Sequence, residues 1–161
     1  LDSESMDTVQ ACYNLLNPSG GVSGNPKFYT QDYGQLIDRA ASKGAGIIVI
    51  RVMAAGALTG VSERHPLALP RVTPIGSSTE YEEDVRRANS FQYLVEEGVV
   101  DSLPEAALRF VLSKGEVSTA LVGVSSLEQL EQSLAWAEKG PLPQAAIEGL
   151  AQVWSRFNPK T

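Results

Sequence analysis

Apolar and polar positions along the chain predict three strands separated by helices. Residues 7–16 (DTVQACYNLL) are mostly apolar, rich in strand formers and followed by the turn-forming sequence NPSGG, so they predict a buried strand. Residues 46–52 (GIIVIRV) hold no polar side chain before Arg51, a pattern typical of a parallel strand buried on both faces. Residues 118–123 (STALVG) predict a short third strand.

Helical periodicity fills the intervals between these strands. Residues 31–43 place Leu36, Ile37, Ala40 and Ala41 on one face and end at Gly44. Capping boxes predict the starts of further helices, at Ser77 with Glu80, Ser102 with Glu105, and Ser125 with Glu128. The first of these helices runs to Gly98 and the second to Gly115, while the third carries Leu127, Leu130, Leu134 and Ala137. A last helix has an apolar face formed by Ala146, Ile147, Leu150, Val153, Trp154 and Phe157.

Strands that alternate with helices indicate βα units and a parallel sheet. Residues 53–76 have no clear periodicity and predict a long loop after the second strand. Three strands are too few for a closed barrel, and they leave two sheet edges unpaired. The chain, which begins at Leu1, is therefore expected to be a single incomplete domain over residues 1–161 that belongs to something longer.

Composition narrows the classes of partner. The 161 residues are 43% hydrophobic and 20% charged, as in an ordinary globular domain, and the formal charge is −6 with scattered basic residues. Nucleic acid and membranes are therefore not expected as partners, and no apolar run approaches the roughly 20 residues of a membrane-spanning helix. The single cysteine, Cys12, excludes an intrachain disulfide and fits a reducing, cytoplasmic location; it is expected to be a buried, inert thiol.

No metal-binding or catalytic motif is visible, and no metal site is expected. The only histidine, His65, lies in the long loop, where a solvated side chain is a simpler interpretation than a base or ligand. At Gly123-Val124-Ser125 a strand leads directly into a helix N-terminus, which is suited to an anion. The alternative is that Ser125 only caps the helix.

Gln10 and Tyr13 form another candidate pair near the C-terminal end of the first strand, where α/β folds place ligands. Their amide and phenol groups would suit a planar heterocycle. In the alternative interpretation Tyr13 belongs to the core and Gln10 bonds neighbouring backbone.

Several of these pieces occur in a familiar order. The chain contains, in this order, a strand with Q-x-x-Y-N-L-L, a helix ending in KGxG, a strand leading into G-x-L-x-G (Gly56–Gly60), LPEAALRFVLS and G-x-S-S-x-E-Q-L. Over residues 7–154 this series closely resembles the C-terminal part of the aldo-keto reductases. The order of these motifs is more specific than any single one.

The resemblance implies an α/β fold that is part of a TIM (β/α)₈ barrel, with strands six to eight of the family barrel plus extra helices. It also implies NADPH bound at the C-terminal face and reduction of aldehydes or ketones to alcohols. Gln10 would bond the nicotinamide carboxamide, Tyr13 would stack on its ring, and Arg51, Met53 and Ala55 would line the pyrophosphate. The adenosine 2′-phosphate would lie at Gly123, Val124 and Ser125, and the adenine at Gln129, Gln132 and Ser133.

Three departures from the family pattern qualify this picture. Arg51-Val52-Met53 stands where the family usually has Ser-Pro-Leu, which adds a guanidinium beside the pyrophosphate. Residues 124–127 hold no Lys or Arg, so NAD is an alternative to NADP. The family's Asp, Tyr, Lys and His tetrad comes from the first four strands, so no catalytic residue is expected in this chain.

The resemblance therefore implies an inactive C-terminal portion of the reductase, which needs the N-terminal barrel half as a partner. A noncatalytic nucleotide-sensing subunit on the same barrel is the main alternative. A standalone half-barrel that dimerises through its open edges is another.

Overall fold

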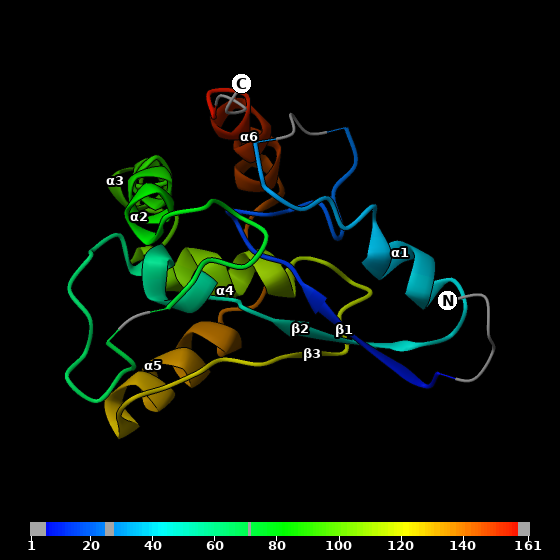
Figure 1. Ribbon diagram of the computed structural model, residues 1–161, viewed down its shortest axis with the longest axis horizontal. Coiled ribbons are helices and arrows are strands. Elements are labelled where there is room, and N and C mark those ends of the chain that lie inside the picture. Colours follow the sequence, from blue (N-terminus) through cyan, green and yellow to red (C-terminus); the bar gives the residue numbers. More distant parts are fainter. Residues whose placement is uncertain (1–5, 25–27, 71, 158–161) are drawn as a thin grey trace.

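A three-stranded parallel sheet in the order β1-β2-β3 forms the base of the molecule (Figure 1). The computed structural model describes residues 6–24, 28–70 and 72–157. The strands are β1 (Thr8–Cys12), β2 (Gly46–Ile50) and β3 (Thr119–Ala120). The predicted parallel pairing is confirmed, but each strand is shorter than predicted. After β1 the chain turns back at once, because Asn14 and Asn17 exchange backbone hydrogen bonds of 3.2 and 3.1 Å.

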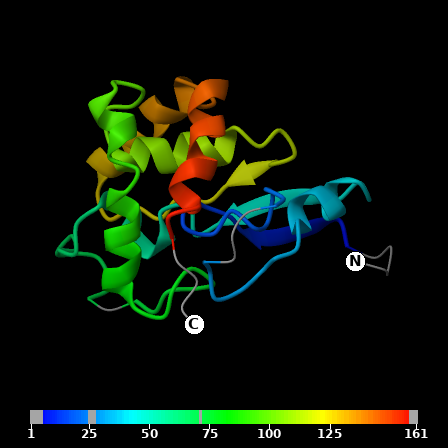
Figure 2. The same ribbon diagram turned by 90° about the horizontal axis from the view of Figure 1, so that it is seen from above.

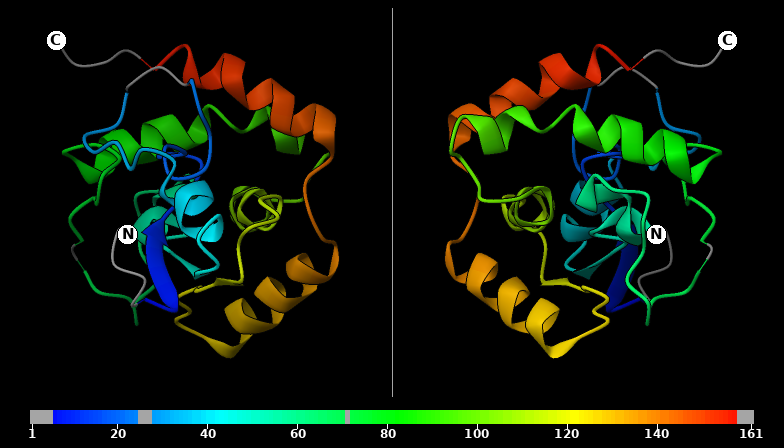
Figure 3. Two further views of the ribbon diagram at one scale, coloured as in Figure 1. Left: turned by 90° about the vertical axis from the view of Figure 1, so that its right-hand side faces the viewer. Right: turned by 90° about the vertical axis from the view of Figure 1, so that its left-hand side faces the viewer.

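The two faces of the sheet differ, so the prediction that β2 is buried on both faces is wrong. Ile47 and Val49 are fully buried, whereas Ile48 and Ile50 are only partly buried. Gln10 pairs with Ile48 in the parallel register and is exposed on the same face. Figure 3 shows helices packed over one face of the sheet only. In the apolar run of β2, therefore, only the face that carries Ile47 and Val49 is fully buried.

Most of the helices form two layers above the sheet (Figure 1). The helices are α1 (Leu36–Ala41), α2 (Tyr81–Asn89), α3 (Tyr93–Glu96), α4 (Leu103–Leu112), α5 (Leu127–Glu138) and α6 (Gln144–Trp154), with a 3₁₀ segment η1 (Ala54–Thr59) inside the predicted long loop. Helices α1 and α4 lie next to the sheet, and α2, α3 and α6 lie beyond α4 (Figures 1 and 3). Figure 2 shows α6 crossing over α4.

Two predicted helices differ from the structure. The helix predicted over 31–43 is reduced to the short α1, because the chain reaches its start, Gln35, in a left-handed conformation with φ 56°. The helix predicted from Ser77 to Gly98 is two helices, α2 and α3. Ser77 does not cap α2: its hydroxyl donates instead to the buried Asp84 carboxylate at 2.5 Å, and the chain enters the helix at Glu80.

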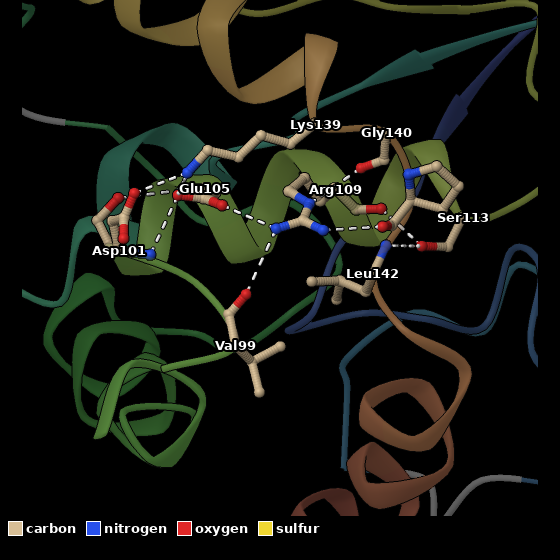
Figure 4. A network of polar contacts seen from close by, with 10 residues as sticks. Val99, Asp101, Glu105, Arg109, Ser113, Lys139, Gly140 and Leu142 are labelled. Carbon is tan, nitrogen blue, oxygen red and sulfur yellow. Dashed lines mark hydrogen bonds and ion pairs between the residues drawn. The ribbon is translucent and has the colours of Figure 1, made fainter. Parts of the chain in front are cut away.

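Helix α4 is the centre of the fold and begins as predicted, with the Ser102 hydroxyl accepting a hydrogen bond from the Glu105 amide. Its polar residues are buried as well as its apolar stripe (Figure 4). The Glu105 carboxylate accepts hydrogen bonds from Arg109 at 2.8 Å, Lys139 at 3.0 Å and the Asp101 amide at 3.1 Å. Arg109 also donates to the carbonyls of Gly140 and Pro141. This polar network fastens the α5–α6 connection to α4.

Helices α5 and α6 are held in different ways. The predicted apolar face of α6 docks on the core, where the Trp154 indole N–H donates to the Leu15 carbonyl at 2.8 Å. Along α5 no residue is fully buried, and Leu127 and Leu134 are 69% and 58% exposed. Trp136 is the part of α5 that packs against the core. Helix α5 is therefore positioned mainly from its C-terminal half.

Candidate functional site

A cavity of about 500 Å³ lies at the C-terminal ends of β2 and β3. Its walls are the segment after β2, the loop before α2, the segment after β3 and one side of α5. Most of the predicted cofactor residues line it, namely Arg51, Met53, Ala55, Gly123, Val124, Ser125, Gln129, Gln132 and Ser133. The cavity thus brings together residues from three separate segments, with a volume in the range of small-molecule sites.

The backbone after β2 is strained where it borders the cavity. Arg51, Ala54 and Ala55 have φ values of 61°, 46° and 59°, in the left-handed region that side chains with a Cβ rarely adopt. The Asn14 side-chain amide holds this segment by donating to the Arg51 carbonyl at 2.9 Å. Such strained residues cluster at ligand sites, since the surrounding structure must hold them in place.

Arg64 covers the cavity from the loop before α2 and was not among the residues expected from the sequence. Its Nη1 donates to the Ala55 carbonyl and its Nε to the Leu69 carbonyl, both at 2.6 Å. The guanidinium carbon lies 5.4 Å from the centroid of the Tyr81 ring. An arginine in a loop without periodicity gives no sequence signal for such contacts, so only the fold reveals it.

His65 lines the same cavity but faces solvent. It is exposed, and its Nδ1 accepts a hydrogen bond from the Leu67 amide at 3.2 Å. This bond organises the loop itself. The placement agrees with the expectation of a solvated loop histidine.

The predicted capping box of Ser125 with Glu128 is wrong, because the cap of α5 lies one residue later. Ser126 is the N-cap, and its hydroxyl accepts from the Gln129 amide at 3.3 Å. In return the Gln129 side-chain oxygen accepts from the Ser125 amide at 2.7 Å. An anion at this junction would therefore compete with the Gln129 side chain for the Ser125 N–H.

The remaining predicted residues of α5 face the cavity from successive turns. The Ser133 hydroxyl donates to the Gln129 carbonyl at 2.7 Å, and Gln132 donates to Glu128 at 3.4 Å. Trp136 continues the same wall with a half-buried indole ring that the sequence did not single out. This side of the cavity therefore offers amides, a hydroxyl and one aromatic face.

Gln10 and Tyr13 lie outside this cavity and apart from each other. Tyr13 is 2% exposed, and its ring stacks on Phe110 with centroids 4.8 Å apart. Burial raises the pKa of Tyr13 well above its ordinary value. Gln10 is exposed on the opposite face of the sheet. Tyr13 thus occupies the core, the alternative considered for it, and the role of Gln10 toward a nicotinamide stays a prediction.

Cys12 is buried, as expected for an inert thiol, and its Sγ lies 3.7 Å from the Ile75 carbonyl. Burial raises the pKa of this thiol, against the opposing effects of a Tyr33 hydrogen bond and the Arg51 charge. Across the described ranges, no group of three or more His, Cys, Asp or Glu side chains is arranged to hold a metal ion. No helix within those ranges has the length and apolar character needed to cross a membrane.

Comparisons with known proteins agree on one family. The profile of the Aldo/keto reductase family matches residues 5–155. Human aflatoxin B1 aldehyde reductase member 4 is 43% identical over 61 residues, which are 35% of this chain and 18% of that protein. Rat aflatoxin B1 aldehyde reductase member 2 is 41% identical over 59 residues, 34% of this chain and 16% of that protein.

A solved structure shares the fold. The holo form of the aldo-keto reductase AKR11C1 from Bacillus halodurans superposes with a TM-score of 0.63 and 16% sequence identity. The match covers 97% of this chain and 45% of that one. The chain therefore spans less than half the length of this structural relative.

Proposed function

Because the chain belongs to the aldo-keto reductase family, we propose that it forms the nucleotide-binding face of an NAD(P)H-dependent oxidoreductase. In this proposal its strands are the sixth to eighth of the family barrel, and the substrate is an aldehyde or ketone. The observation that carries the proposal is the shared cavity. Residues chosen from sequence on three separate segments line one space of about 500 Å³.

Each wall of the cavity suits one part of the cofactor. Arg51, Met53 and Ala55 would hold the pyrophosphate on the strained segment after β2. Gly123, Val124 and Ser125 would face the adenosine 2′-phosphate. The amides and hydroxyl on α5, with the Trp136 ring, would surround the adenine. When bound, the reduced nicotinamide supplies the hydride for carbonyl reduction.

Proton transfer to the carbonyl would come from residues outside these 161. The only histidine is exposed and bonded within its own loop, and Tyr13 is buried in the core. Without a positioned proton donor, the alkoxide that develops during hydride transfer is not stabilised. The chain is therefore proposed to bind cofactor but not to oxidise NADPH with any aldehyde by itself.

Half-cofactors test this proposal by calorimetric titration. Adenosine 2′,5′-bisphosphate is expected to bind more tightly than nicotinamide mononucleotide, because the adenosine side of the cavity is formed within this chain. Ser125→Glu is expected to weaken binding of the bisphosphate by charge repulsion. Ser23→Glu, at an exposed loop position, is the matched control. Tighter binding of the mononucleotide, or equal bisphosphate affinity in Ser125→Glu and wild type, would contradict the proposal.

A further inference from the structure

The junction between β3 and α5 is closed by a side chain of the helix itself. The Gln129 side-chain oxygen accepts a hydrogen bond from the Ser125 amide at 2.7 Å. In a capping box this glutamine would reach back to the amide of the N-cap residue, Ser126, but here it bonds the residue before the cap. Ser125 lines the cavity, whereas Ser126 does not. Gln129 therefore occupies an amide that a ligand in the cavity would otherwise meet.

The charges around this junction disfavour a phosphate. Residues 124–127 hold no Lys or Arg. In the first turn of α5, the Glu128 carboxylate accepts a hydrogen bond at 3.4 Å from Gln132, which lines the cavity. The two arginines among the lining residues, Arg51 and Arg64, belong to other walls, namely the segment after β2 and the loop before α2. A phosphate at the junction would therefore lack a cation and would be repelled by a carboxylate.

A ribose hydroxyl suits the same contacts better than a phosphate does. The junction is open to solvent, since Gly123 is exposed and Val124 is 41% exposed, so an uncharged hydroxyl can keep its hydrogen bonds to water. A phosphate bound to the Ser125 amide would displace the Gln129 side-chain oxygen, which would then lose its donor. These contacts discriminate against a 2′-phosphate without discriminating against the adenosine that carries it.

We propose that Gln129 determines the cofactor specificity of this site and favours NAD(H) over NADP(H). The proposal rests on the proposed function, which places the adenosine ribose of an NAD(P)H cofactor at this junction. It goes further by choosing between the two cofactors. To bind NADPH, Gln129 would have to give up the Ser125 N–H to the 2′-phosphate. NADH lacks that phosphate, so the bond stays intact.

Calorimetric titrations with two nucleotides isolate the effect of the 2′-phosphate. Adenosine 5′-monophosphate and adenosine 2′,5′-bisphosphate differ in that group alone. In wild type, the bisphosphate is expected to bind no more tightly than the monophosphate, at low salt as well as at high salt. A junction that supplied a cation to the phosphate would instead favour the bisphosphate, most strongly at low salt.

Substitutions at Gln129 are expected to change the ratio of the two affinities. Gln129→Ala frees the Ser125 amide, so the ratio is expected to move toward the bisphosphate about threefold, as for one neutral hydrogen bond. Gln129→Arg also adds a charge, so the ratio is expected to move about tenfold and to fall back as salt is added. Gln152→Arg, at an exposed position on α6, is the matched control for the added charge.

The Ser125 amide provides a second readout by NMR. In Gln129→Ala, the bisphosphate is expected to shift the Ser125 amide resonance more than the monophosphate does, because the freed N–H can donate to the 2′-phosphate. If Gln129 served only to cap the helix, the two nucleotides would shift that resonance equally, which would overturn the assignment. Circular dichroism of each variant checks that the helices are retained.

The outcomes distinguish this proposal from the proposed function. If wild type binds neither nucleotide, both are wrong. If wild type favours the bisphosphate, or if both Gln129 variants keep the wild-type ratio, only the assignment to Gln129 is wrong. A ratio that rises in Gln129→Ala and further in Gln129→Arg, but not in Gln152→Arg, supports both.

Discussion

Glu105 and Lys139 form an ion pair across two helices, with 3.0 Å between Oε2 and Nζ, although the Glu105 side chain is fully buried and the Lys139 side chain is 41% exposed (Figure 4). The same carboxylate also accepts from Arg109 and from the Asp101 amide. A single buried group therefore joins the start of α4 to the end of α5. Its neutralisation would leave two cations without their shared partner.

Glu105→Gln is expected to lower the free energy of unfolding by about 2–3 kcal/mol, because it breaks a buried charge network and leaves Arg109 in a desolvated site. Urea unfolding followed by circular dichroism measures the change. Glu148→Gln, at an exposed position on α6, is the control and is expected to be nearly neutral. Equal stability of the two variants would show that the network adds nothing to folding.

The contributions of Glu105 and Asp84 to the free energy of unfolding are expected to change with pH in opposite directions. Burial alone would raise the pKa of Glu105, but hydrogen bonds from Lys139, the Asp101 amide and Arg109 hold it below its ordinary 4.5. Its contribution is therefore present above pH 4.5 and lost as pH falls through the folded-state pKa. Burial raises the pKa of Asp84 above 3.8, against the hydrogen bonds from Ser77 and Ser78. Its contribution is present below pH 3.8 and lost as pH rises through the folded-state pKa.

Unfolding free energies at about pH 4, 6 and 8 test these signs. The Glu105→Gln penalty is expected to shrink toward acid. Asp84→Asn is expected to become more favourable relative to wild type as pH rises, since one buried carboxylate oxygen of Asp84 has no hydrogen-bond partner among the described residues. A penalty for Asp84→Asn that grows with pH would contradict the raised pKa.

Gly76→Ala is expected to destabilise the fold more than Gly98→Ala. Both glycines have positive φ, 76° and 70°, so an alanine at either position has a similar cost in backbone strain. A Cβ at Gly76 would lie 2.7 Å from the Tyr33 hydroxyl oxygen, whereas nothing lies within 4 Å at Gly98. The overlap is expected to cost about 1–3 kcal/mol beyond the control. Thermal melts of the two variants measure the difference, and equal melting temperatures would contradict it.

The leucines of α5 are expected to drive self-association of the chain. Leu127, Leu130 and Leu134 lie on one helical stripe and are 69%, 43% and 58% exposed. Changing all three to Gln is expected to shift sedimentation toward the 17.2 kDa monomer, while Leu67→Gln on the cavity loop is expected to have little effect. A wild-type chain that sediments as a monomer at every concentration would contradict the prediction.

The sequence predicted the parallel sheet, the start of α4 and nine of the residues that line the cavity, because these follow from local apolar periodicity, capping and motif order. Gln10 and Tyr13 were expected to act together as a pair, but they face opposite sides of the sheet. They are three positions apart, and side chains at an odd spacing along an extended segment point to opposite faces. Residue chemistry alone does not convey this geometry.

Other differences came from competition between neighbouring groups. Ser125 and Ser126 each have a Glu or Gln three residues later, so both capping registers fit the sequence, and the structure adopts the second. Ser77 satisfies the local capping pattern but bonds the buried Asp84 instead. Arg64 reaches the cavity through tertiary contacts that no local pattern encodes. For Ser77 and Arg64 the deciding partner comes from tertiary packing, whereas at α5 the choice lies between two local capping registers.

The attachment of α5 at one end has a consequence for hydrogen exchange. Lys139 and the Gly140 and Pro141 carbonyls fix its C-terminal end, but no residue along the helix is fully buried. Its first turns are therefore expected to open by local unfolding at a lower free energy than α4, and their amide protons to exchange sooner. Since those turns form one wall of the cavity, a ligand bound there would slow their exchange and leave the amides of α4 unchanged.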